Sequence, residues 1–154
     1  MNIKRSFTLA AVGTTLAAGI AFDAAAQAKP EDLVKQRRAA MTLMAKYIGP
    51  VGAMVQGKIP YDAAVVTRNT SFVDTLDKMP WDGFNPSTRD VKDTHAKPEI
   101  YGDAEKFKSR WEHLQSEVAK LSAAAKGGDQ NAVKAAFGGV GKACKACHDD
   151  FRRE

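Results

Sequence analysis

Apolar residues recur at intervals of three and four along most of the chain, and this spacing predicts helices and no strands. A stripe of this kind faces the interior of a helical bundle. In the most regular stretch, over 103–127, Asp103 suits the N-cap position and the two glycines at 127–128 favour a helix end. The stripe of this helix comprises Phe107, Trp111, Leu114, Val118, Leu121 and Ala125.

Three other segments have the same helical spacing. They are predicted to span 31–56, 62–78 and a final helix that begins after Asp129. Pro50 is expected to kink or interrupt the first of them, because proline lacks the amide proton and clashes with the preceding turn. Long helices with short connections predict an all-α antiparallel four-helix bundle. The stripe of the final helix comprises Val133, Phe137, Val140, Cys144, Cys147 and Phe151.

One connection is long, the loop over 79–102 between the second and third helices. Its three prolines and two glycines predict irregular structure. Trp81 and Phe84 lie within it. Both side chains are too apolar to be left in water, so we expect the loop to fold back onto the bundle.

The first 26 residues predict a secretory signal peptide. A basic pair at 4–5 precedes an apolar stretch over 7–22, and the alanines at 24–26 fit the small-x-small cleavage rule. We expect cleavage directly after these alanines, export to the periplasm and no membrane insertion of the mature domain, 27–154. This domain carries 21 Lys and Arg and 17 Asp and Glu. These charges are interspersed, without the clustered basic face that nucleic-acid binding needs.

The only two cysteines of the chain lie near its C-terminus, in the sequence CKACH at 144–148. A thiol–disulfide oxidoreductase places such a motif at a helix N-terminus in a βαβ fold, whereas here it falls near the C-terminus of a predicted helix. A closed zinc site needs four ligands, so His95 or His113 would have to join the motif. His95 lies in a charged stretch and His113 on the polar side of its predicted helix.

Covalent haem attachment, for which C-x-x-C-H is the signature, explains the spacing better. Two thiols three residues apart add to the two vinyl groups on one side of a porphyrin, and the adjacent imidazole reaches the iron. We therefore predict one haem c per chain, bound through Cys144 and Cys147, with His148 as the iron ligand. No Met or His follows His148, so a ligand on the opposite face would have to come from an earlier helix.

Over 27–154 the chain resembles cytochrome c′, the class II c-type cytochromes of bacteria. The resemblance implies a four-helix bundle with a five-coordinate haem iron that binds nitric oxide and carbon monoxide without enzymatic turnover. It also implies a homodimer, with protection against nitric oxide or electron transfer to a partner protein as its role. The resemblance is carried by AKPEDLVKQRRAAMTLM at 28–44, PYDAA at 60–64, MPWDGF at 79–84, KLSAAA at 120–125, AAFGGVGKACKACH at 135–148 and the terminal CKACHDDFRR at 144–153.

The resemblance implies roles for five residues outside the C-x-x-C-H motif. Met41 matches the position that blocks the distal face of the haem. Arg37 matches an arginine that pairs with a haem propionate, and an arginine on an otherwise apolar stripe itself calls for an anionic partner. Trp81 and Phe84 match apolar residues that close over the haem, and Arg152 matches an arginine beside the proximal pocket.

Met41 leaves one alternative open. A low-spin branch of the same family uses a first-helix methionine as a sixth iron ligand, in electron transfer. Met44 lies three residues further on and is able to face the same space. The first helix also offers apolar residues for an outer face that mediates self-association: Leu43, Tyr47 and Met54.

Overall fold

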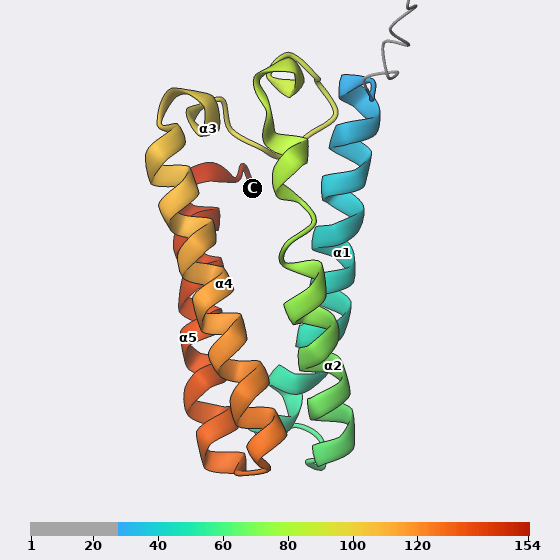
Figure 1. The fold of residues 1–154 in the computed structure, drawn as a ribbon, viewed down its shortest axis with the longest axis vertical. Coiled ribbons are helices and arrows are strands. Elements are labelled where there is room, and N and C mark those ends of the chain that lie inside the picture. The colour runs from blue at the N-terminus through green and yellow to red at the C-terminus, as the bar shows by residue number, and fades with distance from the viewer. Residues whose placement is uncertain (1–27) are drawn as a thin grey trace, which may run out of the picture.

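A computed structural model describes residues 28–154, which form a four-helix bundle (Figure 1). Successive long helices run in opposite directions, and within this part of the chain there is no strand. The predicted all-α antiparallel bundle is therefore confirmed, while the predicted signal peptide, 1–26, lies outside the described residues. None of the described helices has the length and apolar character needed to cross a membrane. The four long helices are α1 (Pro30–Val55), α2 (Ala63–Leu76), α4 (Ala104–Gly127) and α5 (Gln130–Phe151).

Most helix ends have the predicted chemistry. The carboxylates of Asp62 and Asp129 accept hydrogen bonds from first-turn backbone amides at 3.0 and 2.8 Å, so both residues are N-caps. Gly128 ends α4 in the left-handed region, with φ of 75°. Asp103 precedes α4 as predicted, but its side chain makes no capping hydrogen bond.

Pro50 lies inside α1, which continues through it, so the structure excludes the interruption that was predicted as the alternative to a kink. The following turn is anchored in the bundle. Val51 is fully buried, and a Cβ on Gly52 would come within 2.7 Å of the Phe137 ring of α5. This packing offsets the single hydrogen bond that the proline removes.

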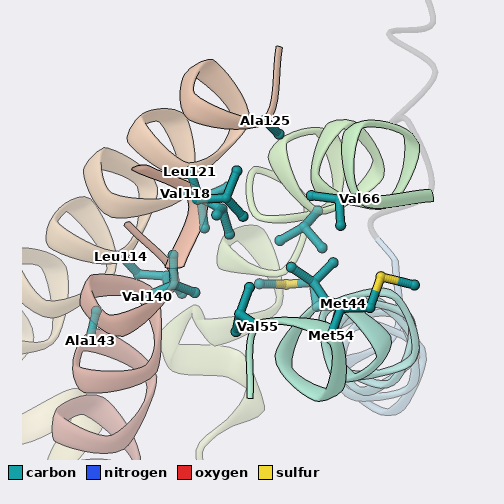
Figure 2. Close-up of a cluster of buried hydrophobic side chains, with 13 residues drawn as sticks. Met44, Met54, Val55, Val66, Leu114, Val118, Leu121, Ala125, Val140 and Ala143 are labelled. Atoms are coloured by element: carbon teal, nitrogen blue, oxygen red, sulfur yellow. The ribbon is translucent and has the colours of Figure 1, made fainter. Parts of the chain in front are cut away.

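The main core fills the half of the bundle farthest from the loop, and all four long helices contribute to it (Figure 2). Figure 2 shows Val55 of α1, Val66 of α2 and Leu121 of α4 gathered around one centre. Burial of each such side chain contributes about 1.5–3 kcal/mol to folding. Met54 also belongs to this core and is only 7% exposed, so its predicted place on an outer face was wrong.

The loop over 79–102 is more regular than its prolines and glycines predicted. It folds back onto α1 as expected, and a Cβ on Gly83 would come within 2.8 Å of the Leu33 carbonyl oxygen. This contact places the loop over the end of the bundle where α1 begins and α5 ends (Figure 1). The loop contains two 3-10 helices and one helical turn: η1 (Trp81–Phe84), η2 (Pro86–Thr88) and α3 (Glu99–Gly102).

Candidate haem-binding site

The C-x-x-C-H motif lies in the last two turns of α5, where two apolar clusters meet. Cys144 packs against the main core, whereas Cys147 packs against a second cluster near the loop. Trp81 packs against both clusters. Side chains three and four residues apart lie on one face of a helix, so the two thiols and His148 are presented together. The buried members of the second cluster are Ile100, Phe107 and Phe151.

Both thiols are free and half-buried. Burial raises the pKa of the Cys144 thiol, and burial together with the neighbouring Cys144 raises the pKa of Cys147 to about 11. Thiol–disulfide oxidoreductases need the opposite, a lowered pKa that stabilises the thiolate. This environment therefore disfavours the dithiol redox alternative.

His148 lies on the wall of a cavity of about 340 Å³, which Lys97 and Arg152 also line. Partial burial lowers the pKa of His148, and the positive charge of Arg152 lowers it further. The neutral imidazole is thereby favoured, which is the form that binds metals. Arg152 is exposed and forms the C-cap of α5, and it lines the same cavity as His148.

Aromatic rings cover the Cys147 side of the motif. Trp81 stacks on Trp111 with ring centroids 4.7 Å apart, and Phe84 meets Phe107 edge-on at 4.9 Å. Phe107 in turn contacts Phe151 at 5.1 Å, in the last turn of α5. Trp81, Phe84 and Cys147 thus pack against the same apolar cluster. Trp111 was recognised in the sequence only as a stripe residue, since nothing in its spacing shows that the loop would stack on it.

Arg37 is buried, with 3% of its surface exposed, so its guanidinium does not reach solvent. Within residues 28–154 no carboxylate pairs with it. It instead donates to loop oxygens and lies 4.4 Å from the centre of the Phe84 ring. These acceptors could not be predicted from the sequence, because loop residues have no periodicity that places them. They are the Gly83 carbonyl at 2.5 Å, the Thr94 and Thr88 hydroxyls at 2.8 and 3.1 Å, and the Tyr101 hydroxyl at 3.5 Å.

The two methionines of α1 that the sequence left unresolved occupy different environments. Met44 is 7% exposed and belongs to the main core. Met41 is half-buried and packs at the edge of that core, as Cys144 does. Of the two, Met41 is therefore the one whose side chain is not enclosed in the core.

The remaining histidines do not join the motif. His95 and His113 are both exposed. Within residues 28–154, no three His, Cys, Asp or Glu side chains gather into a group suited to a metal ion. The donor set at the end of α5 is two thiols and one imidazole beside apolar surface, which fits a covalently attached porphyrin.

A helical bundle that carries C-x-x-C-H in its last helix, between two apolar clusters, has the architecture of a c-type cytochrome. The family model for cytochrome c′ matches residues 32–152. A curated cytochrome c′ of Alcaligenes xylosoxydans xylosoxydans is 46% identical over 127 residues, which cover 82% of this chain and 98% of the relative.

Solved structures give the same result. The crystal structure of cytochrome c′ from Rubrivivax gelatinosus matches with a TM-score of 0.79 at 45% identity, over 81% of this chain and 98% of that one. The nitric oxide complex of a mutant cytochrome c prime from Alcaligenes xylosoxidans matches with a TM-score of 0.76 at 46% identity, over 82% of this chain and 98% of that one. The chain belongs to the cytochrome c′ family, whose members carry covalently attached haem c.

Proposed function

We propose that this protein is a periplasmic haem protein whose five-coordinate iron binds nitric oxide and carbon monoxide. The observation that carries the proposal is the placement of the C-x-x-C-H motif where two apolar clusters meet, with Met41 at the edge of one of them. The nitric oxide complex of the related cytochrome supports the choice of ligand. The predicted signal peptide supports export. Tight binding of nitric oxide, without turnover, would protect the cell from this gas.

Each residue of the motif has a defined role in this proposal. Cys144 and Cys147 form the thioether bonds, and His148 is the proximal iron ligand. Once attached, the haem supplies an iron that binds a diatomic gas. Met41 blocks the distal face without binding the iron, and Arg152 adds positive charge beside His148.

Three further side chains act on the edge and face of the cofactor. Trp81 and Phe84 exclude water, since both belong to the aromatic cluster beside Cys147. Arg37 pairs with a propionate. Its burial and the absence of a carboxylate partner among the described residues support this role.

The ferric spectrum distinguishes this proposal from a low-spin electron carrier with Met41 as the sixth ligand. We expect a high-spin spectrum that Met41→Leu leaves unchanged. For Met41→Ala we expect carbon monoxide to associate at least about tenfold faster, equivalent to about 1.4 kcal/mol of activation free energy, because a barrier over the iron is removed. Stopped-flow mixing with the ferrous protein measures this rate.

Met44→Leu is the matched control, because it conserves volume in the main core one turn away and is expected to leave the rate unchanged. A low-spin ferric spectrum that becomes high-spin in Met41→Leu would establish the electron carrier instead. An unchanged rate in Met41→Ala would show that this side chain does not guard the iron.

We further propose that the protein is a homodimer through the outer face of α1 and α2. Leu43 and Phe72 are 39% and 42% exposed, and the Phe72 ring lies 4.8 Å from that of Tyr47. Phe72→Glu is expected to convert the dimer to monomer in sedimentation velocity, because it places a charge in a buried apolar contact. Ile59→Glu, an equally exposed apolar position between the two helices, is the control and should leave the dimer intact. A chain that sediments as a monomer without substitution contradicts the proposal.

A further inference from the structure

The C-terminus of α5 has an unusual partner. The last four carbonyl groups of a helix receive no hydrogen bond from residues of the helix itself, so they need donors from elsewhere. In α5 the first of these, on His148, accepts from the backbone amide of Arg152 at 3.0 Å. The other three accept from a single loop residue, Lys97. Its backbone amide donates to Phe151 at 2.9 Å, and its Nζ donates to Asp149 at 2.9 Å and Asp150 at 3.3 Å.

The loop strengthens this contact on either side of Lys97. The Arg153 amide donates to the His95 carbonyl at 2.7 Å, and Ala96 forms an isolated antiparallel bridge with Arg152. The segment 95–97 therefore runs along the chain directly after His148. Lysine near a helix C-terminus is also favoured by the negative end of the helix dipole.

The opposite side of the same turn is held by α4. Arg110 donates to the Asp150 carboxylate through Nε and Nη2, both at 3.0 Å, and Lys106 lies 3.3 Å from its other oxygen. The Phe151 ring packs on Phe107 of α4. The turn that carries His148 is thus held between the loop and α4. Within residues 28–154, Lys97 is the only loop residue whose side chain donates hydrogen bonds to this turn.

We propose that Lys97 is a positioning residue for His148, which fixes the direction from which the imidazole approaches the iron. The proposal rests on the proposed role of His148 as the proximal ligand. Lys97 acts at a distance of one helical turn, through the carbonyls of Asp149 and Asp150. It also lines the cavity beside His148. Through the same loop, whose oxygens bind Arg37 of α1, the proximal turn is connected to the first helix.

The test is Lys97→Met in the protein with its haem attached. The substitution keeps the backbone amide and the length of the side chain but removes the charged donor. We expect the iron–histidine stretching band of the ferrous protein to shift and broaden in resonance Raman spectra. We also expect the Arg152 and Arg153 amides to exchange hydrogen about tenfold faster, because charge-assisted hydrogen bonds that hold their turn are lost.

Two further variants make the result specific. Lys97→Arg retains donors at this place and is expected to restore the band and the exchange rates. Lys108→Met removes a lysine from the exposed face of α4, where Nζ pairs with Glu112 at 3.1 Å, and is expected to change neither. An unchanged iron–histidine band in Lys97→Met, or an equal change in Lys108→Met, overturns the inference. Absence of an iron–histidine band from the unsubstituted protein overturns the proposed role of His148 instead.

Discussion

When serine replaces both Cys144 and Cys147, the denatured polypeptide is expected to carry no haem, because no covalent bond retains it. Serine is close to cysteine in size, but its hydroxyl does not form a thioether with a vinyl group. The two sulfur atoms lie against different apolar clusters, and each is expected to bond to one of the two vinyl groups of the cofactor. The measurement is the intact mass of protein produced in a host that matures c-type cytochromes. The unsubstituted chain should carry the added mass of one haem, and the double variant should not.

The single variants provide the internal control for this experiment. Cys144→Ser and Cys147→Ser each leave one thiol in place, and we expect haem to stay attached through the remaining thioether in part of the protein. His148→Ala should retain both thioethers and change the spectrum of the iron. A double variant that still carries haem mass under denaturing conditions would refute the attachment sites.

Replacing Asp77 with asparagine is expected to stabilise the protein at neutral pH. Asp77 follows α2 and is completely buried, and neither carboxylate oxygen has a hydrogen-bond partner among the described residues. Its nearest cation is Lys78 Nζ, 3.8 Å from Oδ1. Burial raises the pKa of Asp77 from an ordinary value of 3.8 to about 6, although Lys78 opposes the shift. A negative charge is also unfavourable at a helix C-terminus.

Because the pKa of Asp77 is raised in the folded protein, Asp77 is expected to make the protein less stable as the pH rises. A carboxyl group with a higher pKa in the folded state binds more protons there than in the unfolded chain, so stability falls as the pH rises between the two pKa values. The full penalty is therefore present above about pH 6 and absent below about pH 4, and a shift of this size corresponds to about 3 kcal/mol. Asp77→Asn removes this penalty and keeps the backbone carbonyl that accepts from Trp81 and Gln115.

Urea denaturation of the haem-containing protein at several pH values measures the effect. We expect the gain in unfolding free energy of Asp77→Asn over the unsubstituted chain to be about 3 kcal/mol larger at pH 8 than at pH 4. Asp103→Asn, which removes an exposed carboxylate that makes no capping hydrogen bond, controls for the loss of one negative charge. An equal gain at both pH values would show that Asp77 does not titrate as its burial implies.

The sequence was sufficient for the helices and for the C-x-x-C-H motif because both depend on local spacing. The stripe from Phe107 to Ala125 predicted α4, and the caps at Asp62 and Asp129 predicted two helix starts. The helix continues past Pro50, where the sequence allowed an interruption, because tertiary packing of Val51 holds the following turn in place. The side assigned to Met54 was wrong because nearly all of the last turn of α1 is buried, including Val51, Gly52 and Val55, so this turn has no apolar outer face.

The partners of Arg37 illustrate what local spacing does not contain. Its burial requires that oxygens from four loop positions converge on one guanidinium. That convergence depends on the path of the loop, which is set by the close approach of Gly83 to α1. In the same way, the contact of Lys97 with α5 joins positions about fifty residues apart. Periodicity identifies the face of a helix, but it does not identify what a loop brings to that face.

If Arg37 pairs with a haem propionate as proposed, its neutral surroundings in the protein link cofactor binding to folding. A guanidinium stays protonated at all physiological pH values, so a positive charge without a counter-ion in residues 28–154 is enclosed whenever the loop closes over α1. Enclosing such a charge is electrostatically costly. In the proposed pairing a propionate would supply the counter-ion, so closure of the loop would be more favourable after the haem is bound. Haem binding and packing of the loop would then be thermodynamically coupled, and each would promote the other.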